Sequence, residues 1–306
     1  MPGPITRRTF AQRLLAGAAA GAIPDWQAAA QPSRRLRIGC TALIWGAVPR
    51  TPENLTAAVR DMDSLGFHGF ETFASIVSDW DAKGTLAPLL AAHRIPLISG
   101  YATVQLTDSA ARKDNLAQVI QWGRALKKHG GRFMVLAPNG VKREAYTFAD
   151  HRATIVSGLN EFAKAMNDLG LGAGLHQHTG TAVESRDETY AVMEAVDTRY
   201  VKFAPDVGQL QKGGADAAKV VKDFASITVH MHLKDFKGWE HFAGYCPLGE
   251  GKVDLKAILD TVEASNPTAN IMHELDGSAN APYTPLQTAE IGKKYLQGLG
   301  YSFRTT

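Results

Sequence analysis

The sequence predicts an α/β protein that folds as a single (β/α)8 (TIM) barrel, and three observations lead to this prediction. Short apolar runs of strand length alternate with longer helical patterns from residue 36 onward. Eight such units fall within about 270 residues, which matches the count and size of this barrel. A doubly wound sheet shows the same alternation, but no Gly-x-Gly-x-x-Gly follows the first run and no interruption divides the chain into halves.

Each expected strand is an apolar run bounded by turn-forming or polar residues. The expected strands are Leu36–Trp45, Phe67–Phe73, Ile95–Thr103, Arg132–Pro138, Leu171–His178, Val201–Val207, Ile227–Lys234 and Asn270–Asp276. In the seventh, apolar residues alternate with His230, His232 and Lys234, so that two imidazoles and an ammonium share one face. Such a strand suits the inner wall of a closed barrel.

The expected helices follow the strands and carry recognisable start and stop signals. They are Pro52–Leu65, Leu86–His93, Ala111–His129, Phe148–Leu169, Arg186–Val196, Asp216–Phe224, Asp254–Ala264 and Leu286–Leu296. Thr51 is an N-cap residue placed before Pro52 at the first helical position. Gly66, Gly130 and Gly170 follow helices at positions where a left-handed backbone is favoured.

Composition allows a large core and gives little support for a nucleic-acid partner. The chain has 306 residues, of which 45% are hydrophobic and 21% are charged. Its net charge is +3, and residues 1–30 contribute +2 of this through Arg7, Arg8 and Arg13 against Asp25. The remainder is close to neutral, so no basic surface for nucleic acid is expected.

Residues 1–30 are typical of an export signal of the twin-arginine type. Thr6–Phe10 contains paired arginines, the mildly apolar run Leu14–Ile23 follows, and Ala28–Ala30 forms a cleavage pattern. The apolar run is about half of the ~20 residues that span a bilayer, so no permanent membrane span is expected. The sequence therefore predicts recognition by the twin-arginine export machinery and a periplasmic mature domain over residues 31–306. The alternative is that the two arginines occur by chance before an Ala-rich helix.

The export hypothesis predicts that the periplasmic product begins near Gln31, because cleavage follows the Ala-x-Ala pattern at residues 28–30. Amino-terminal sequencing or intact-mass measurement of protein from a periplasmic extract checks this. A periplasmic product that retains Met1 contradicts it.

Cys40 and Cys246 are the only cysteines, so the chain has no disulfide framework and no thiolate zinc cluster. Two unpaired thiols are expected, and a single bridge between them is left open.

Residues at the carboxyl ends of the strands are the candidates for chemistry, because barrel enzymes place their active sites there. The polar side chains expected at this end are Glu71, Tyr101, Asn139, His176, His178, Asp206, Gln209, His230, His232, Lys234, Glu274 and Asp276. Alone, each could be an ordinary hydrogen-bonded side chain at a barrel mouth.

Four of these candidates come from consecutive strands: His176 or His178, then Asp206, His232 and Glu274. Neighbouring strands lie about 4.8 Å apart, so their side chains can converge on one cation. Mixed imidazole and carboxylate ligands favour Mn²⁺, with Co²⁺, Fe²⁺, Zn²⁺ or Mg²⁺ as alternatives, over Ca²⁺. The sequence therefore predicts a divalent metal site with these ligands.

Six segments in a fixed order resemble the xylose-isomerase-like barrel superfamily of sugar isomerases, epimerases and inosose dehydratases. They are Gly69–Glu71, His176–Thr181, Asp206–Gln209, His232–Asp235, Pro247–Asp254 and Glu274–Asp276. The resemblance implies a divalent metal held by Asp206, His232 and Glu274. His176 stands where epimerases of this group usually carry glutamate, and Gln209 where many carry histidine. The His-x-His-x-Gly-Thr pattern looks more like the inosose-dehydratase branch.

A metal beside a carbonyl and a positioned base support enediolate chemistry. The first expectation is a sugar isomerase or epimerase that acts on a keto sugar or polyol, with Glu274, His176 and Lys234 as catalytic candidates. A lyase that uses the same metal site is the alternative, and an ion pair with Asp235 or another acid at the barrel rim is the structural alternative for Lys234.

Four residues are candidates for binding the carbohydrate substrate: Glu71, His178, Gln209 and Trp239. Glu71 could instead complete a polar layer, and Trp239 could only pack its loop. A non-catalytic carbohydrate-binding barrel is a competing function, and a metal-dependent endonuclease is disfavoured by the near-neutral charge. Homo-oligomerisation is left open.

Overall fold

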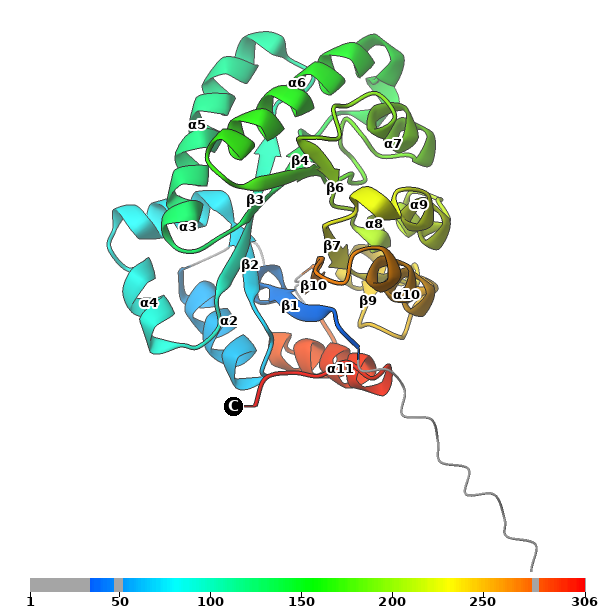
Figure 1. Cartoon of the computed structure of the whole chain (residues 1–306). Coiled ribbons are helices and arrows are strands. Elements are labelled where there is room, and N and C mark those ends of the chain that lie inside the picture. Colours follow the sequence, from blue (N-terminus) through cyan, green and yellow to red (C-terminus); the bar gives the residue numbers. More distant parts are fainter. Residues whose placement is uncertain (1–33, 47–51, 277–280, 306) are drawn as a thin grey trace, which may run out of the picture. The chain divides into compact units, whose positions relative to one another are not determined.

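The computed structural model describes residues 34–46, 52–276 and 281–305, and it confirms the barrel. The predicted export signal over residues 1–30 lies outside the described residues. Eight parallel strands are hydrogen-bonded in the order β6-β5-β4-β3-β2-β1-β10-β7. Parallel bridges from Phe203 to Thr228 and from Asp206 to His232 join the two ends of this order, so the sheet closes on itself (Figure 1). The strands are β1 (Arg37–Thr41), β2 (Phe70–Phe73), β3 (Leu97–Val104), β4 (Phe133–Pro138), β5 (Gly172–Leu175), β6 (Val201–Phe203), β7 (His230–Leu233) and β10 (Asn270–His273).

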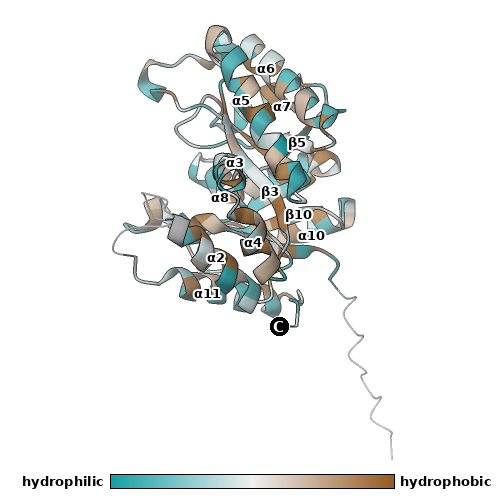
Figure 2. Ribbon diagram, turned by 90° about the vertical axis from the view of Figure 1, so that its left-hand side faces the viewer, coloured by the Kyte–Doolittle hydropathy of each residue, from teal (hydrophilic) through white to brown (hydrophobic). Residues whose placement is uncertain are grey.

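Helices form a ring outside the strands, as Figure 1 shows. They are α2 (Pro52–Ser64), α3 (Ala74–Ala82), α4 (Leu86–Ala92), α5 (Ser109–Lys128), α6 (Phe148–Asp168), α7 (Arg186–Met193), α8 (Val207–Lys212), α9 (Ala217–Asp223), α10 (Leu255–Ser265) and α11 (Pro285–Gly298). Most hydrophobic segments lie on the strands and on the helix sides that face them (Figure 2). The main core therefore lies between the strand wall and the helices, where Ile38, Phe162 and Leu259 are fully buried.

The interior of the barrel is divided into an apolar floor and a polar layer above it. Phe133, Val135 and Ala204 form a separate buried cluster inside the strands. The His230 ring stacks on Phe133 with a centroid distance of 4.8 Å and an interplanar angle of 7°. Because this floor supplies no water or polar groups, the side chains above it must satisfy one another.

Several elements differ from the sequence prediction. Helices α3 and α8 were not predicted, nor was the small hairpin of β8 (Asp235–Phe236) and β9 (Tyr245–Cys246). The expected strand Val201–Val207 is wrong in its second half, because β6 ends at Phe203 and Asp206 is the N-cap of α8. The Asp206 carboxylate accepts the backbone N–H of Gln209 at 3.0 Å, which starts the helix directly after the strand.

Cys40 and Cys246 are both buried, and both are unpaired thiols, as the sequence predicts. Within the described part of the chain, no helix has the length and apolarity needed to cross a membrane.

Asp235 anchors the segment after β7. Its carboxylate accepts the backbone N–H groups of Gly249, Gly251, Val253 and Phe236 at 2.8–3.1 Å. Lys234 therefore does not pair with Asp235, which contacts this loop, but with the other acids that the structural alternative allowed, Asp206, Glu274 and Asp276.

Candidate metal centre and active site

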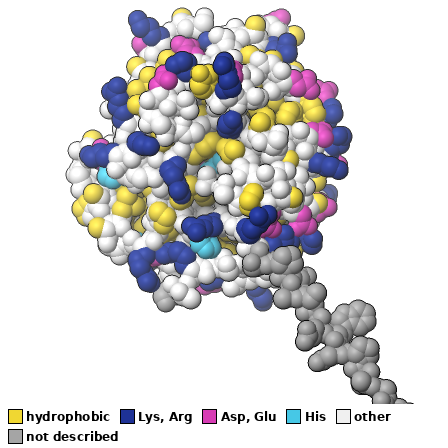
Figure 3. Space-filling model, in the orientation of Figure 1, with side chains coloured by type: hydrophobic (Ala, Val, Ile, Leu, Met, Phe, Trp, Pro, Cys, Tyr) yellow, Lys and Arg dark blue, Asp and Glu magenta, His cyan; other side chains and the backbone are white. Residues whose placement is uncertain are grey.

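Two cavities lie at opposite ends of the barrel. One of about 620 Å³ is at the amino-terminal end, where Arg35, Arg37 and Arg132 contribute to its lining. Figure 3 shows the amino-terminal face, with Lys and Arg side chains spread around its centre. The other cavity, of about 320 Å³, is at the carboxyl ends of the strands. The smaller cavity is the candidate active site, because buried acids and imidazoles converge there and barrel enzymes use this end.

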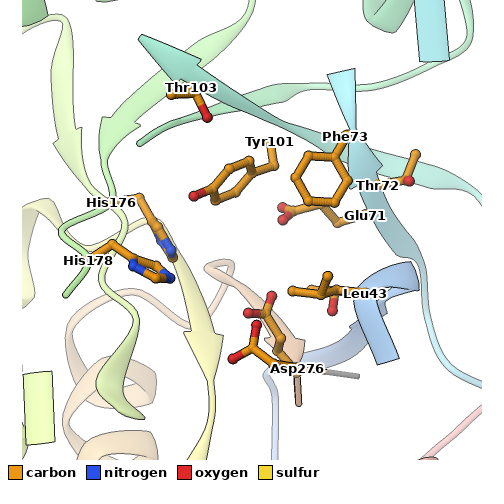
Figure 4. Close-up of a pocket in the computed structure, with 11 residues that line it drawn as sticks. Leu43, Glu71, Thr72, Phe73, Tyr101, Thr103, His176, His178 and Asp276 are labelled. Carbon is orange, nitrogen blue, oxygen red and sulfur yellow. The ribbon is translucent and has the colours of Figure 1, made fainter. Parts of the chain in front are cut away.

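Five strands or their following loops line this cavity. The lining residues are Thr41, Leu43, Glu71, Thr72, Phe73, Tyr101, Thr103, His176, His178, Glu274 and Asp276. Figure 4 shows both histidines on one side of the cavity, with Tyr101, Phe73 and Glu71 on another and Leu43 and Asp276 across from Tyr101. A volume of this size is at the lower limit of the usual range for small-molecule sites.

His232 lies at the centre of the polar layer, between two carboxylates. Its Nε2 is 2.6 Å from Oε1 of Glu71, and its Nδ1 is 2.8 Å from Oε2 of Glu274. Burial opposes a charge on this ring, but the carboxylates of Glu274 and Glu71 raise the pKa of His232 well above its usual value.

His176 is suited to be a neutral ligand. Its Nδ1 lies 2.9 Å from the carbonyl oxygen of Ala204 and donates to it, which leaves a lone pair on Nε2. Burial, followed by the nearby His232 charge, holds the pKa of His176 well below its usual value. His176, Asp206 and His232 each bring one ligand atom to within 4.8 Å of the others.

Both ring nitrogens of His178 make hydrogen bonds within the protein, and this distinguishes it from His176 as a candidate metal ligand. Gln209 Oε1 accepts from the Thr179 hydroxyl at 2.6 Å, so its amide NH₂ must donate to Nε2 of His178, 2.6 Å away. His178 Nδ1 then donates to the Thr179 carbonyl at 2.8 Å. The geometry therefore favours His176 as the ligand, and it places Gln209 behind His178 rather than on the cavity wall.

Lys234 is fully buried among three carboxylates. Its Nζ is 2.6 Å from Glu274, 2.9 Å from Asp206 and 3.0 Å from Asp276. Burial disfavours the ammonium, but the charges of Asp206, Asp276 and Glu274 together raise the pKa of Lys234 well above its usual value. The ammonium thus compensates acids that would otherwise repel one another.

The donor set fits a divalent cation. His232 Nδ1 and Glu274 Oε2 approach to 2.8 Å, yet their alignment is not that of a hydrogen bond, as expected of neighbouring ligands of one ion. Asp206 Oδ2 also lacks an aligned hydrogen bond. Of the four residues predicted as ligands, His176, Asp206 and His232 form one such group, and Glu274 contacts His232. Two imidazoles with two carboxylates suit a transition metal or zinc.

Trp239, like Gln209, is a predicted substrate-binding residue that does not line the cavity. Its indole N–H donates to the carbonyl of Tyr245, and the Lys237 ammonium lies 3.5 Å from the centre of its ring. Trp239 instead stabilises the β8–β9 hairpin. Sequence reasoning missed Ser99, whose hydroxyl donates to Glu71 at 2.6 Å, because a serine within an apolar strand gives no signal of its partner.

Comparison with known families and proteins supports the assignment of the fold. The family model described as the xylose isomerase-like TIM barrel matches residues 59–297. The inosose dehydratase of Clostridium perfringens (strain ATCC 13124) is 26% identical over 160 residues, which cover 47% of this chain and 53% of the enzyme. The chain thus spans about half the length of this relative.

Two solved structures share the fold at low sequence identity. The IOLI protein with a bound zinc atom has a TM-score of 0.71 and 14% identity, and the match covers 89% of this chain and 100% of that one. D-psicose 3-epimerase in the presence of D-fructose has a TM-score of 0.69 and 16% identity, with coverage of 87% and 100%. At these identities the similarity establishes the fold alone.

Proposed function

This chain belongs to the xylose isomerase-like TIM barrel family, and we propose that it is a divalent-metal-dependent enzyme of the sugar isomerase or epimerase type. The proposed reaction removes the proton beside the carbonyl of a keto sugar or keto polyol. The observation that carries the proposal is that His176, Asp206 and His232 each bring a ligand atom to within 4.8 Å of the others, while Glu274 lies 2.8 Å from His232 and lines the cavity.

These four residues would hold the cation. When bound, it would act as a Lewis acid that stabilises the negative charge developing on the substrate oxygen. The bound zinc of a structural neighbour and the mixed imidazole and carboxylate donors support Zn²⁺ or Mn²⁺ in this role.

Glu274 is the proposed base, because it combines access to the cavity with a permanent charge. Burial raises the pKa of its carboxyl group, but His232 and Lys234 outweigh burial and hold that pKa well below its usual value. Glu274 is therefore ionised at neutral pH and can accept a proton from a substrate carbon. The catalytic role first expected of His176 does not fit its use as a ligand, because its Nδ1 donates to Ala204 and its Nε2 would face the metal.

A lyase is the second candidate function, and one residue favours it. His176 stands where epimerisation would be served by a second carboxylate, and an imidazole that binds a metal through Nε2 cannot serve as that second base. The inosose dehydratases among the relatives support this alternative. In both reactions the first step is the same proton removal.

Metal analysis followed by solvent exchange tests the proposal. We expect about one equivalent of Zn²⁺ or Mn²⁺ per chain and, in D₂O, deuterium incorporation beside the carbonyl of at least one sugar in a panel of unphosphorylated keto sugars and keto-inositols, followed by NMR. An epimeric product supports the first function, and loss of water supports the lyase. Sugar binding without deuterium uptake would instead indicate a non-catalytic binding protein.

A further inference from the structure

Glu71 is enclosed by side chains from two strands, β3 and β7. Its Oε1 lies 2.6 Å from His232 Nε2, while Oε2 lies 2.9 Å from His230 Nε2 and 2.6 Å from the Ser99 hydroxyl. The side chain is only 2% exposed, although it contributes to the cavity wall. Both oxygens are therefore occupied inside the protein, and little acceptor capacity is left for a substrate hydroxyl.

His230 holds Glu71 from below. It is fully buried, its ring stacks on Phe133, and neither of its ring nitrogens has an aligned hydrogen bond, although Nε2 lies 2.9 Å from Oε2 of Glu71. Glu71 is the only acid within reach of its Nε2 among the described residues. The stacked ring and Ser99 thus fix the direction of the Glu71 carboxylate, which the apolar floor could not do.

An ionised carboxylate can only accept hydrogen bonds, so the His232 nitrogen that faces Glu71 must carry a proton. A neutral imidazole has a single N–H, and its other nitrogen then presents a lone pair. In His232 that other nitrogen is Nδ1, which faces Glu274 at 2.8 Å and stands among the proposed ligands. The contact with Glu71 therefore selects the tautomer that can bind a metal.

We propose that Glu71, held by His230 and Ser99, is a positioning residue that fixes His232 as the Nε2–H tautomer and presents its Nδ1 to the divalent metal. The inference rests on the metal site of the proposed function and replaces the substrate-binding role first expected of Glu71. Without the Glu71 carboxylate, the proton of the neutral His232 ring moves from Nε2 to Nδ1, where the N–H donates to Oε2 of Glu274. Nδ1 then has no lone pair for the metal. Removal of the hydrogen-bond partner of a metal-binding histidine typically lowers metal affinity about 10–100-fold.

The test compares Zn²⁺ affinity, measured by competition with a chromophoric chelator, in four proteins. Glu71→Leu is expected to weaken binding about 10–100-fold relative to the unsubstituted chain. Glu71→Gln, which keeps a carbonyl acceptor for His232, is expected to lose less. Glu188→Leu is the matched control, because it removes a buried carboxylate that caps α7 away from the cavity, and its Zn²⁺ affinity is expected to be unchanged.

Nitrogen-15 NMR of the histidine side chains supplies a second readout. In the Zn²⁺-loaded protein the His232 signals, assigned by their loss in His232→Asn, are expected to show a protonated Nε2. In metal-free Glu71→Leu they are expected to show the proton on Nδ1.

The outcomes separate this inference from the proposed function. If the unsubstituted chain binds no divalent metal, the metal site and this inference both fail. If it binds Zn²⁺ but Glu71→Leu binds equally tightly, or keeps the Nε2–H tautomer, only the role of Glu71 is overturned. A loss in Glu188→Leu as large as that in Glu71→Leu would attribute the effect to general destabilisation and would also overturn it.

Discussion

Lys234→Met is expected to lower the free energy of unfolding of the metal-free protein by about 3–5 kcal/mol, because it removes one partner from a buried charge cluster. Asp206 and Glu274 would be left close together without the ammonium that lies 2.9 Å and 2.6 Å from them. Methionine fits the space that the lysine stem occupies. That stem packs closely against Gly208, because a Cβ added to Gly208 would lie only 2.8 Å from Cγ of Lys234. The loss is therefore electrostatic rather than steric.

A divalent cation is expected to restore most of this loss, since its charge can take the place of the ammonium between the same carboxylates. Urea unfolding of Lys234→Met in EDTA and in Zn²⁺ measures both effects. Lys237→Met is the matched control, because its ammonium pairs with Glu250 at 2.9 Å near the surface, and we expect a change below about 1 kcal/mol. Equal midpoints for the Lys234→Met and unsubstituted proteins in EDTA would contradict the prediction.

The alternating pattern of the seventh strand made much of this site predictable. A period of two places His230, His232 and Lys234 on one face, and the structure buries all three inside the barrel. In the last strand, the same period of two predicts that Glu274 points inward and His273 outward. The His273 ring indeed packs against Gly292 of α11. Residues on adjacent strands must meet when the sheet closes, so the candidate ligands could be brought together from sequence alone.

Contacts between distant parts of the chain could not be predicted in this way. Glu71 and His232 are separated by 161 residues, and their contact depends on strand register across the barrel. The choice between His176 and His178 depends on hydrogen bonds to Ala204 and Gln209, which a pattern of residue types does not encode. Helix α8 was missed because its six residues include a glycine and follow a strand without an intervening turn.

Glu274→Gln is expected to reduce solvent deuterium exchange at the substrate carbon about 10²–10⁴-fold, which is the usual contribution of a general base. The amide cannot accept the proton, although it keeps the size of the side chain and an oxygen that can face the metal. Because Glu274 is also a proposed ligand, the measurement is made at saturating Zn²⁺ or Mn²⁺, with bound metal determined in the same samples.

Asp206→Asn is the matched control for the loss of a ligand charge, and it separates the two roles of Glu274. Asp206 is buried and contacts Lys234 as Glu274 does, but it caps α8 and does not line the cavity. With metal bound, the Asp206→Asn variant is expected to keep measurable deuterium exchange at the substrate carbon, whereas the Glu274→Gln variant is expected to lose it. Equal exchange rates in the two metal-loaded variants would show that Glu274 acts only as a ligand and would remove it as the base.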